Sequence, residues 1–184
     1  GDGGITLDAY YTSAQSGVSG PVISGNDISM SPGSTVIATT GILVEDCTGT
    51  GINMADNFVA VPTDAIVTDG CDFIDENSEL VGGDQASTSG VVSTSGDSVT
   101  LSGTTISGFD TGVESDAGTL SVIDYATIAG ASEGIWAYDT QLLINYADLD
   151  GGASGVGLVV EDSGEALMYC VNLTGSGGME ILNT

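Results

Sequence analysis

The sequence contains no lysine, no arginine and no histidine, whereas 26 of its 184 residues are aspartate or glutamate, giving a formal net charge of −26 at pH 7. Without basic side chains, the chain cannot form ordinary salt bridges between side chains, and it has nothing to neutralise nucleic-acid phosphate. A P-loop loses its lysine, and catalytic triads and imidazole metal sites lose their histidine. We therefore expect no nucleic-acid partner and no enzyme of these classes.

Other features are scarce as well. The chain has three prolines, three cysteines and 5% aromatic residues. No apolar run approaches the 18 residues of a membrane-spanning helix, so we expect no membrane span. The sequence starts at Gly1 rather than methionine, which favours a mature extracellular or cell-surface chain whose targeting segment has been removed. Apolar residues make up 41% of the chain and its mean hydropathy is +0.26, so the acidity does not indicate disorder.

A recurring hexapeptide dominates what the sequence does contain. "GILVED" at residues 41–46 returns as "GLVVED" at residues 157–162. Related segments begin at Gly90, Gly112 and Gly134, and at Asp64, where aspartate replaces the glycine. The starts 41, 64, 90, 112, 134 and 157 are separated by 23, 26, 22, 22 and 23 residues. Gly17-Val18 fits one step earlier and Gly178-Met179 one step later, so we interpret the pattern as an internal repeat.

Each repeat holds three short segments in which apolar and polar residues alternate, separated by Gly, Asp, Asn and Ser. This pattern resembles a parallel β-helix of the pectate-lyase-like type over residues 17–184. The resemblance implies an all-β fold, a β-solenoid with three short strands per turn of about 23 residues, seven to eight turns and right-handed coiling. Residues 1–16 would form an N-terminal arm or a first partial turn. The alternative is a β-sandwich, which does not require such a period.

Stacked repeats place equivalent residues in columns. The inward columns predicted from the alignment are small or branched, and they are Ile42, Ala65, Val91, Val113, Ile135 and Leu158, followed two residues on by Val44, Val67, Ser93, Ser115, Ala137 and Val160. The outward column between them is apolar at five of six positions: Leu43, Ile66, Val92, Glu114, Trp136 and Val159. Such a surface favours an interface between subunits. Cover by a loop or by the N-terminal arm remains the other interpretation.

Aspartates recur at the end of the same segment, at Asp46, Asp69, Asp116, Asp139 and Asp162. Carboxylates about 5 Å apart repel each other by about 0.8 kcal/mol in water. A hard cation such as Ca²⁺ would offset this repulsion, because carboxylate oxygens are its preferred ligands. The alternative is that each aspartate is a solvated turn former. No motif in the sequence requires any other cofactor.

The three cysteines fall into two groups. Cys47 and Cys71 are 24 residues apart, about one turn, which favours a disulfide between them. Cys170 lies five turns from Cys71 and is either buried or available for a bond between subunits, and we place it with the predicted assembly interface. Asn172 begins a glycosylation sequon inside a predicted strand, which favours a structural role.

Function follows from these exclusions. Enzymes that resemble this fold use arginine, lysine or histidine beside their carboxylates, so the remaining catalytic candidate is the carboxylate pair Asp148 and Asp150. A surface adhesin or binding solenoid is the first alternative. The best-supported prediction is a non-enzymatic, secreted structural subunit that polymerises with copies of itself into a protease-resistant sheath, tube or filament. In overall character the chain resembles the hoop-forming structural proteins of archaeal extracellular sheaths.

Overall fold

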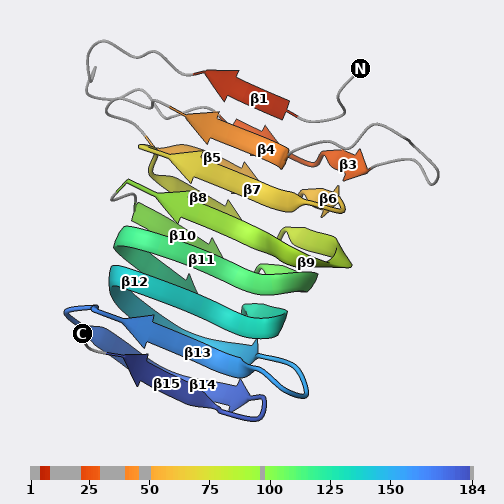
Figure 1. Cartoon of the computed structure of the whole chain (residues 1–184). Coiled ribbons are helices and arrows are strands. Elements are labelled where there is room, and N and C mark those ends of the chain that lie inside the picture. Colours follow the sequence, from red (N-terminus) through yellow and green to blue (C-terminus); the bar gives the residue numbers. More distant parts are fainter. Residues whose placement is uncertain (1–4, 9–21, 30–39, 46–50, 96–97, 183–184) are drawn as a thin grey trace.

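A computed structural model describes residues 5–8, 22–29, 40–45, 51–95 and 98–182. These residues contain strands and turns but no helix. The strands coil around one axis and stack into a rod (Figure 1). In Figure 1 the front strands run from right to left and the rear strands from left to right as the chain descends, so the coil is right-handed. The predicted parallel β-solenoid is confirmed, with about six turns rather than the seven to eight expected.

Three parallel sheets form the sides of the rod. The first sheet holds β1 (Ile5–Asp8), β4 (Thr40–Glu45), β7 (Asp64–Asp69), β13 (Val156–Glu161) and β15 (Met179–Leu182). The second holds β2 (Val22–Ser24), β5 (Ile52–Ala55), β8 (Phe73–Glu76) and β10 (Ser98–Ser102), and the third holds β3 (Asp27–Ser29) and β6 (Phe58–Ala60). The long strands β9 (Glu79–Thr94), β11 (Thr105–Ile123), β12 (Thr127–Asp150) and β14 (Ala166–Thr174) continue around corners from one sheet to the next.

The register of the first sheet confirms the predicted repeat with one correction. The alignment paired Ile42 with Ala65, but in the structure Ile42 pairs with Ile66, and Ile66 pairs in turn with Val91. Ala65 therefore occupies the glycine position that the alignment gave to Asp64. The reason is loop length: the steps from 42 to 66 and from 66 to 91 are 24 and 25 residues, whereas the later steps from 91 to 113 and from 113 to 135 are 22. The small side chain of Ala65 fits where glycine stands elsewhere.

The ladder also continues at both ends of the six aligned copies. Leu158 pairs with Met179, as the repeat predicts. At the other end the strand beside β4 is β1, in which Ile5 pairs with Ile42. The Gly17-Val18 copy lies outside the described residues.

The core is one continuous column of apolar side chains inside the coil. The corrected inward column of the first sheet is fully or almost fully buried at Ile42, Ile66, Val91, Val113, Ile135 and Leu158. Aliphatic residues from the other two sheets face it, together with Phe73 and Phe109. Each such side chain stabilises the fold by about 1.5–3 kcal/mol relative to exposure. Parallel strands stack these side chains on like neighbours, because the pairings within the first sheet run in register from turn to turn. The register shifts between β11 and its neighbours fall around Phe109, between the third and the first sheet.

Two corners of each turn are built from residues with positive φ. The corner after the first sheet has Gly70, Ser95, Ala117, Asp139 and Asp162, and the corner after the second has Gly25, Asp56, Asn77, Gly103, Asp124, Tyr146 and Cys170. Glycine, asparagine and aspartate tolerate this left-handed conformation best, which explains why they recur there. The corners thus account for many of the residues that separate the alternating segments.

Hydroxyl and amide donors take the place of basic side chains. Asp110 accepts hydrogen bonds from Ser132 Oγ at 2.6 Å and from the Ser87 amide at 2.8 Å, one turn to either side. These two bonds lower the pKa of Asp110. Asp64 likewise accepts from the amide of Ser89 at 2.8 Å, 25 residues away. The carboxylates therefore tie neighbouring turns together without any salt bridge between side chains.

Candidate functional site

The outer column of the first sheet consists of Leu43, Val67, Val92, Glu114, Trp136 and Val159. The expectation that Ile66 belongs to this surface is wrong, because Ile66 is 1% exposed in the core and Val67 stands in its place. Val159 points outward by register but is only 6% exposed. Trp136 is partly exposed and stacks on Tyr138, with ring centroids 6.1 Å apart and an interplanar angle of 14°. The outer column is therefore a half-covered apolar strip.

The predicted aspartate column does not form a single row. Asp116 pairs with Tyr138, and Asp139 lies one residue further along, at the left-handed corner that Asp162 also occupies. Asp69 belongs to the row of Glu45 and accepts a hydrogen bond from Ser95 Oγ at 2.5 Å, and Asp46 lies outside the described residues. No group of three potential ligands suited to a metal ion occurs in the part of the chain that the structure describes. Turn formation explains Asp139 and Asp162, and Ca²⁺ binding stays a prediction.

The described cysteines occupy contrasting places. Cys71 is completely buried beside Phe73, at the edge of the core. Its predicted partner Cys47 lies outside the described residues, so their pairing stays a prediction. Cys170 is a free and exposed thiol in the middle of β14. Asn172 lies two residues further along the same strand, where its side chain is exposed and its backbone pairs with Asp148.

Tyr125, Tyr146 and Tyr169 form a cluster beside Cys170, and we call these four residues the tyrosine–thiol corner. Tyr146 contacts Tyr125 with ring centroids 5.5 Å apart and Tyr169 with centroids 5.7 Å apart. Tyr146 and Cys170 hold the same left-handed corner position in consecutive turns. The negative charge of the Cys170 thiolate raises the pKa of Tyr146, followed by a smaller contribution from burial. This cluster was not predicted, although tyrosines recurring at 125, 146 and 169 could have indicated it.

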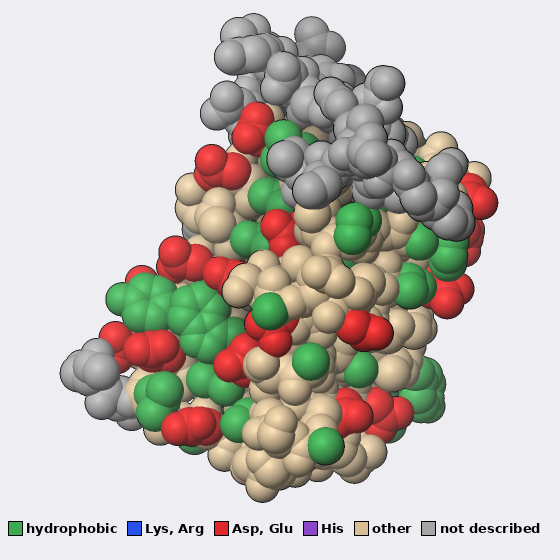
Figure 2. Space-filling model, turned by 45° about the vertical axis from the view of Figure 1, so that its right-hand side comes forward, with side chains coloured by type: hydrophobic (Ala, Val, Ile, Leu, Met, Phe, Trp, Pro, Cys, Tyr) green, Lys and Arg blue, Asp and Glu red, His purple; other side chains and the backbone are tan. Residues whose placement is uncertain are grey.

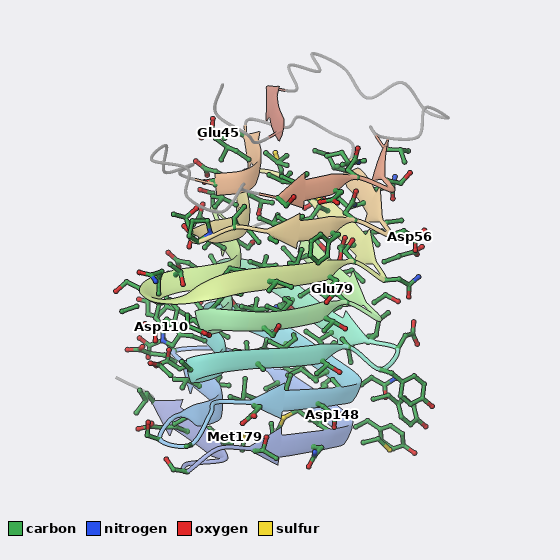
Figure 3. All side chains as sticks on the ribbon, turned by 90° about the vertical axis from the view of Figure 1, so that its right-hand side faces the viewer. Glu45, Asp56, Glu79, Asp110, Asp148 and Met179 are labelled. Carbon is green, nitrogen blue, oxygen red and sulfur yellow. The ribbon has the colours of Figure 1, made fainter. Side chains whose placement is uncertain are left out.

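The last layer of the rod, formed by β14 and β15, leaves core positions in solvent. Met168 is 39% exposed, whereas Ile144, its partner one turn earlier, is completely buried. Ile181 is 58% exposed, whereas its partner Val160 is 5% exposed. Leu167, Met179 and Leu182 are also substantially exposed. Figure 3 shows Met179 at the end of the rod opposite Glu45.

Backbone groups at this layer are unpaired along one edge. Within the described residues, β14 pairs only with β12 and β15 pairs only with β13. Each of these strands therefore has one edge that no described strand covers. Residues 163–182 include the acidic groups Glu165 and Glu180. Figure 2 shows how widely acidic side chains are spread over the rod. The outer column of the first sheet is the best candidate for a functional surface.

Buried polar groups form a separate network at one corner of the core. Asp75 is 0% exposed and accepts hydrogen bonds from Ser78 Oγ and Thr104 Oγ1, each at 2.6 Å. Burial raises the pKa of Asp75, and the two hydrogen bonds oppose this effect. Asn57 continues the network by accepting from the amide of Asn26 at 3.2 Å. Because Asp75 is sealed from solvent, its role is structural.

The carboxylate pair considered for glycoside hydrolysis lies on the outside of the third sheet. Asp148 and Asp150 are both exposed, and Asp150 accepts a hydrogen bond from the amide of Gly152 at 2.9 Å. Figure 3 labels Asp148 below Glu79, on the face of the rod turned toward the viewer. The next strand presents Asn172 and Thr174 beside them. Nothing in these contacts singles out either carboxylate as an acid or a nucleophile.

Comparisons with protein-family models, with curated proteins and with solved structures gave no significant match. In the described part of the chain, no helix is long and apolar enough to cross a membrane. The functional argument therefore rests on the surfaces of this molecule alone.

Proposed function

We propose that this protein is a secreted structural subunit that assembles with copies of itself into an extracellular sheath, tube or filament. The observation that carries the proposal is the outer column of the first sheet, in which apolar side chains from successive turns form one partly exposed strip. Such a strip on the side of a rod favours an interface between subunits.

The energetics favour contact through this strip. Full burial of an aliphatic or aromatic side chain contributes about 1.5–3 kcal/mol, and Leu43, Val67, Val92 and Trp136 would each gain part of this amount. The net charge of −26 opposes any association. Added salt should strengthen the contact, since it screens charge over about 8–10 Å and leaves the apolar contribution intact.

The contact made by the outer column is lateral, because the column runs along the side of the rod. The absence of lysine and arginine also removes every trypsin-type cleavage site, as suits a durable wall material.

The experiment compares assembly of matched aspartate variants. Light scattering after size-exclusion chromatography, followed by electron microscopy, should show the wild-type chain assembling as salt is raised. Val92→Asp should remain monomeric, because it places a charge in the outer column. Ile74→Asp should assemble like wild type, because Ile74 is 42% exposed on the second sheet, away from that column. A wild-type chain that stays monomeric at every salt and protein concentration would refute the proposal.

A binding solenoid is the second candidate, and the exposed tyrosine–thiol corner favours it. Tyr125 and Tyr169 are 79% and 63% exposed, and exposed aromatic faces are common at ligand-binding surfaces. Binding of soluble polysaccharides that is lost in Tyr125→Ala would support this candidate. In neither case do we expect the chain to cleave polysaccharides, because the basic groups that assist proton transfer in similar folds do not occur in its sequence.

A further inference from the structure

We propose that Tyr125 and Tyr146 form an oxidative cross-linking site, at which a carbon–carbon bond between the two phenol rings joins consecutive turns of the rod. The product is a dityrosine within one chain, and the oxidant is hydrogen peroxide acting through a haem peroxidase. The inference goes beyond the proposed self-assembly and does not depend on it, because both tyrosines belong to the same molecule.

Both tyrosines stand in a backbone conformation that bulky side chains rarely adopt. Tyr125 has a φ of 66° and Tyr146 a φ of 52°. Tyr146 holds the corner position after the second sheet, and Tyr125 follows Asp124 at the same corner one turn earlier. The preceding turns use only glycine, aspartate or asparagine at this position: Gly25, Asp56, Asn77, Gly103 and Asp124. Tyrosine strains the backbone in this conformation, so its use at two adjacent corners points to a role for the side chains.

Packing does not account for the pair. Tyr125 is 79% exposed and Tyr146 is 39% exposed, so their contact removes little apolar area from water and offsets little of the backbone strain. The sequence also has no lysine or arginine whose charge could stack on either ring. The exposed phenols are instead accessible to a reagent that approaches from solvent.

The backbone holds the two rings against each other. The amide of Tyr125 donates a 2.7 Å hydrogen bond to the carbonyl of Tyr146, which fixes the two corners relative to one another. The ring centroids are 5.5 Å apart and the ring planes are inclined by 37°. Ring edges are in van der Waals contact at this separation. Reacting groups held in this way behave as if they were at very high concentration, so coupling within the pair is favoured over coupling to a distant tyrosine.

Tyr146 has a second aromatic neighbour, Tyr169, in a different geometry. Their centroids are 5.7 Å apart, but the interplanar angle is 83°. A perpendicular arrangement directs the edge of one ring at the face of the other, whereas the rings of a biaryl are joined edge to edge with a moderate twist. Tyr125 is therefore the better coupling partner for Tyr146. Coupling between two copies is opposed by the net charge of −26.

The cross-link forms through two one-electron oxidations, which the haem of the peroxidase carries out. Each phenol loses one electron and one proton, leaving a tyrosyl radical on each ring. The two radicals pair through the ring carbons ortho to their oxygens. The hydrogen on each of these carbons then moves to the oxygen, which restores both phenols. The two electrons and two protons reduce one hydrogen peroxide to two water molecules, so the protein loses two hydrogen atoms.

The experiment treats the full chain, in dilute solution, with a haem peroxidase and hydrogen peroxide. The intact mass should fall by that of two hydrogen atoms, and the fluorescence of dityrosine should appear. Digestion of the unfolded product with a glutamate-specific protease should recover residues 115–133 joined to residues 134–161, because Glu114, Glu133 and Glu161 bound these peptides. Fragmentation of the joined peptides should assign the bond to Tyr125 and Tyr146.

Matched phenylalanine variants identify the partners, because they keep the ring and remove only the hydroxyl. Tyr125→Phe and Tyr146→Phe should each abolish the cross-link, whereas Tyr169→Phe should retain it. The oxidised wild-type chain should also unfold at a higher temperature than the untreated chain, since the bond closes a loop in the unfolded state. Oxidised Tyr125→Phe should lack this increase.

The remaining outcomes would overturn the inference. Loss of the cross-link in Tyr169→Phe would show that Tyr146 couples to Tyr169. Cys170 is hydrogen-bonded to Tyr146, so a loss of two hydrogen atoms without dityrosine fluorescence, absent in Cys170→Ser, would show a thioether instead. Covalent dimers that persist on dilution would show coupling between chains, and an unchanged mass would show that no coupling occurs. None of these results bears on self-assembly, which light scattering measures on the unoxidised chain.

Discussion

Asp75 and Thr104 lie in adjacent turns of the core, and the Thr104 hydroxyl donates a 2.6 Å hydrogen bond to the Asp75 carboxyl group. A second bond of the same length comes from Ser78. No basic side chain exists in the sequence to accompany this buried acid. Burial without a basic partner favours the neutral carboxyl group, although the two hydrogen bonds oppose this effect, and it makes stability depend on pH.

We predict that Asp75→Asn stabilises the protein in neutral and mildly alkaline buffer. Because burial raises the pKa of Asp75, the folded state holds its proton at pH values where the unfolded state has lost it. Stability therefore falls as pH rises from the unfolded pKa through the folded pKa. Asparagine cannot ionise, so the variant should be more stable by on the order of 1 kcal/mol above this window. Urea unfolding in acidic and alkaline buffers measures the difference, and an unchanged pH dependence in the variant would contradict the prediction.

A second prediction concerns hydroxyl groups in the core. The Oγ1 atom of Thr68 is buried without a hydrogen-bond partner, so Thr68→Val should raise the free energy of unfolding by about 1 kcal/mol. Thr140 is the matched control. Its hydroxyl donates to the Tyr138 carbonyl at 2.8 Å, so Thr140→Val should destabilise by about 1 kcal/mol. Equal effects of the two substitutions in thermal unfolding would argue against this assignment.

The close packing between turns gives a third prediction. A Cβ added to Gly112 would lie 2.4 Å from the carbonyl oxygen of Gly134 in the next turn, so Gly112→Ala should destabilise by about 3 kcal/mol or more. Gly164 has nothing within 4 Å of the same position, so Gly164→Ala should change stability by less than about 0.5 kcal/mol. Chemical denaturation of both variants tests whether the glycines are kept for contact between turns or for flexibility.

Our fourth prediction is the disulfide between Cys47 and Cys71. Closing a loop of this length stabilises the folded state by about 3 kcal/mol. Reduction, or Cys71→Ser, should lower stability by about this amount, whereas Cys170→Ser should leave the stability of the monomer unchanged. Alkylation of all three cysteines in the folded chain without prior reduction would show that the bond does not form.

The fifth prediction tests the outer column. Trp136→Asp places a charge in the partly exposed strip and removes the stack on Tyr138. We expect a folded subunit that does not assemble. Leu143→Asp is the control, because Leu143 is 44% exposed on the second sheet, outside the strip. Normal growth of the Trp136 variant would exclude the outer column from assembly.

The fold could be predicted from the sequence because every stacked turn needs the same kinds of side chain at equivalent positions. Glycine recurs wherever a turn passes close to the next, and apolar residues recur wherever the chain faces the axis. The register failed in β7, at Ala65, Ile66 and Val67, since alanine can replace glycine there and the loops on either side are longer by two or three residues. The alignment placed Asp69 in the column of Asp46, whereas Asp69 pairs with Glu45, and this apparent match concealed the shift of one residue.

The candidate site was less predictable for a physical reason. Alternation tells which side chains face the axis, but it does not tell which strand lacks a neighbour. Met168 and Ile181 have the pattern of core residues and are exposed only because no described strand stacks on β14 and β15. The predicted aspartate row failed similarly: Asp116 and Asp139 have the same spacing as the repeat but occupy a strand and a corner.

The parallel register has a mechanical consequence. Within each turn the covalent chain runs around the circumference, while the hydrogen bonds between turns, such as that from the Asn77 amide to the Ser102 carbonyl, point along the axis. Widening the rod would therefore strain covalent bonds, whereas stretching it would load rows of hydrogen bonds that share the force. Such a rod resists an increase in its circumference, and under tension along its axis it separates between whole turns.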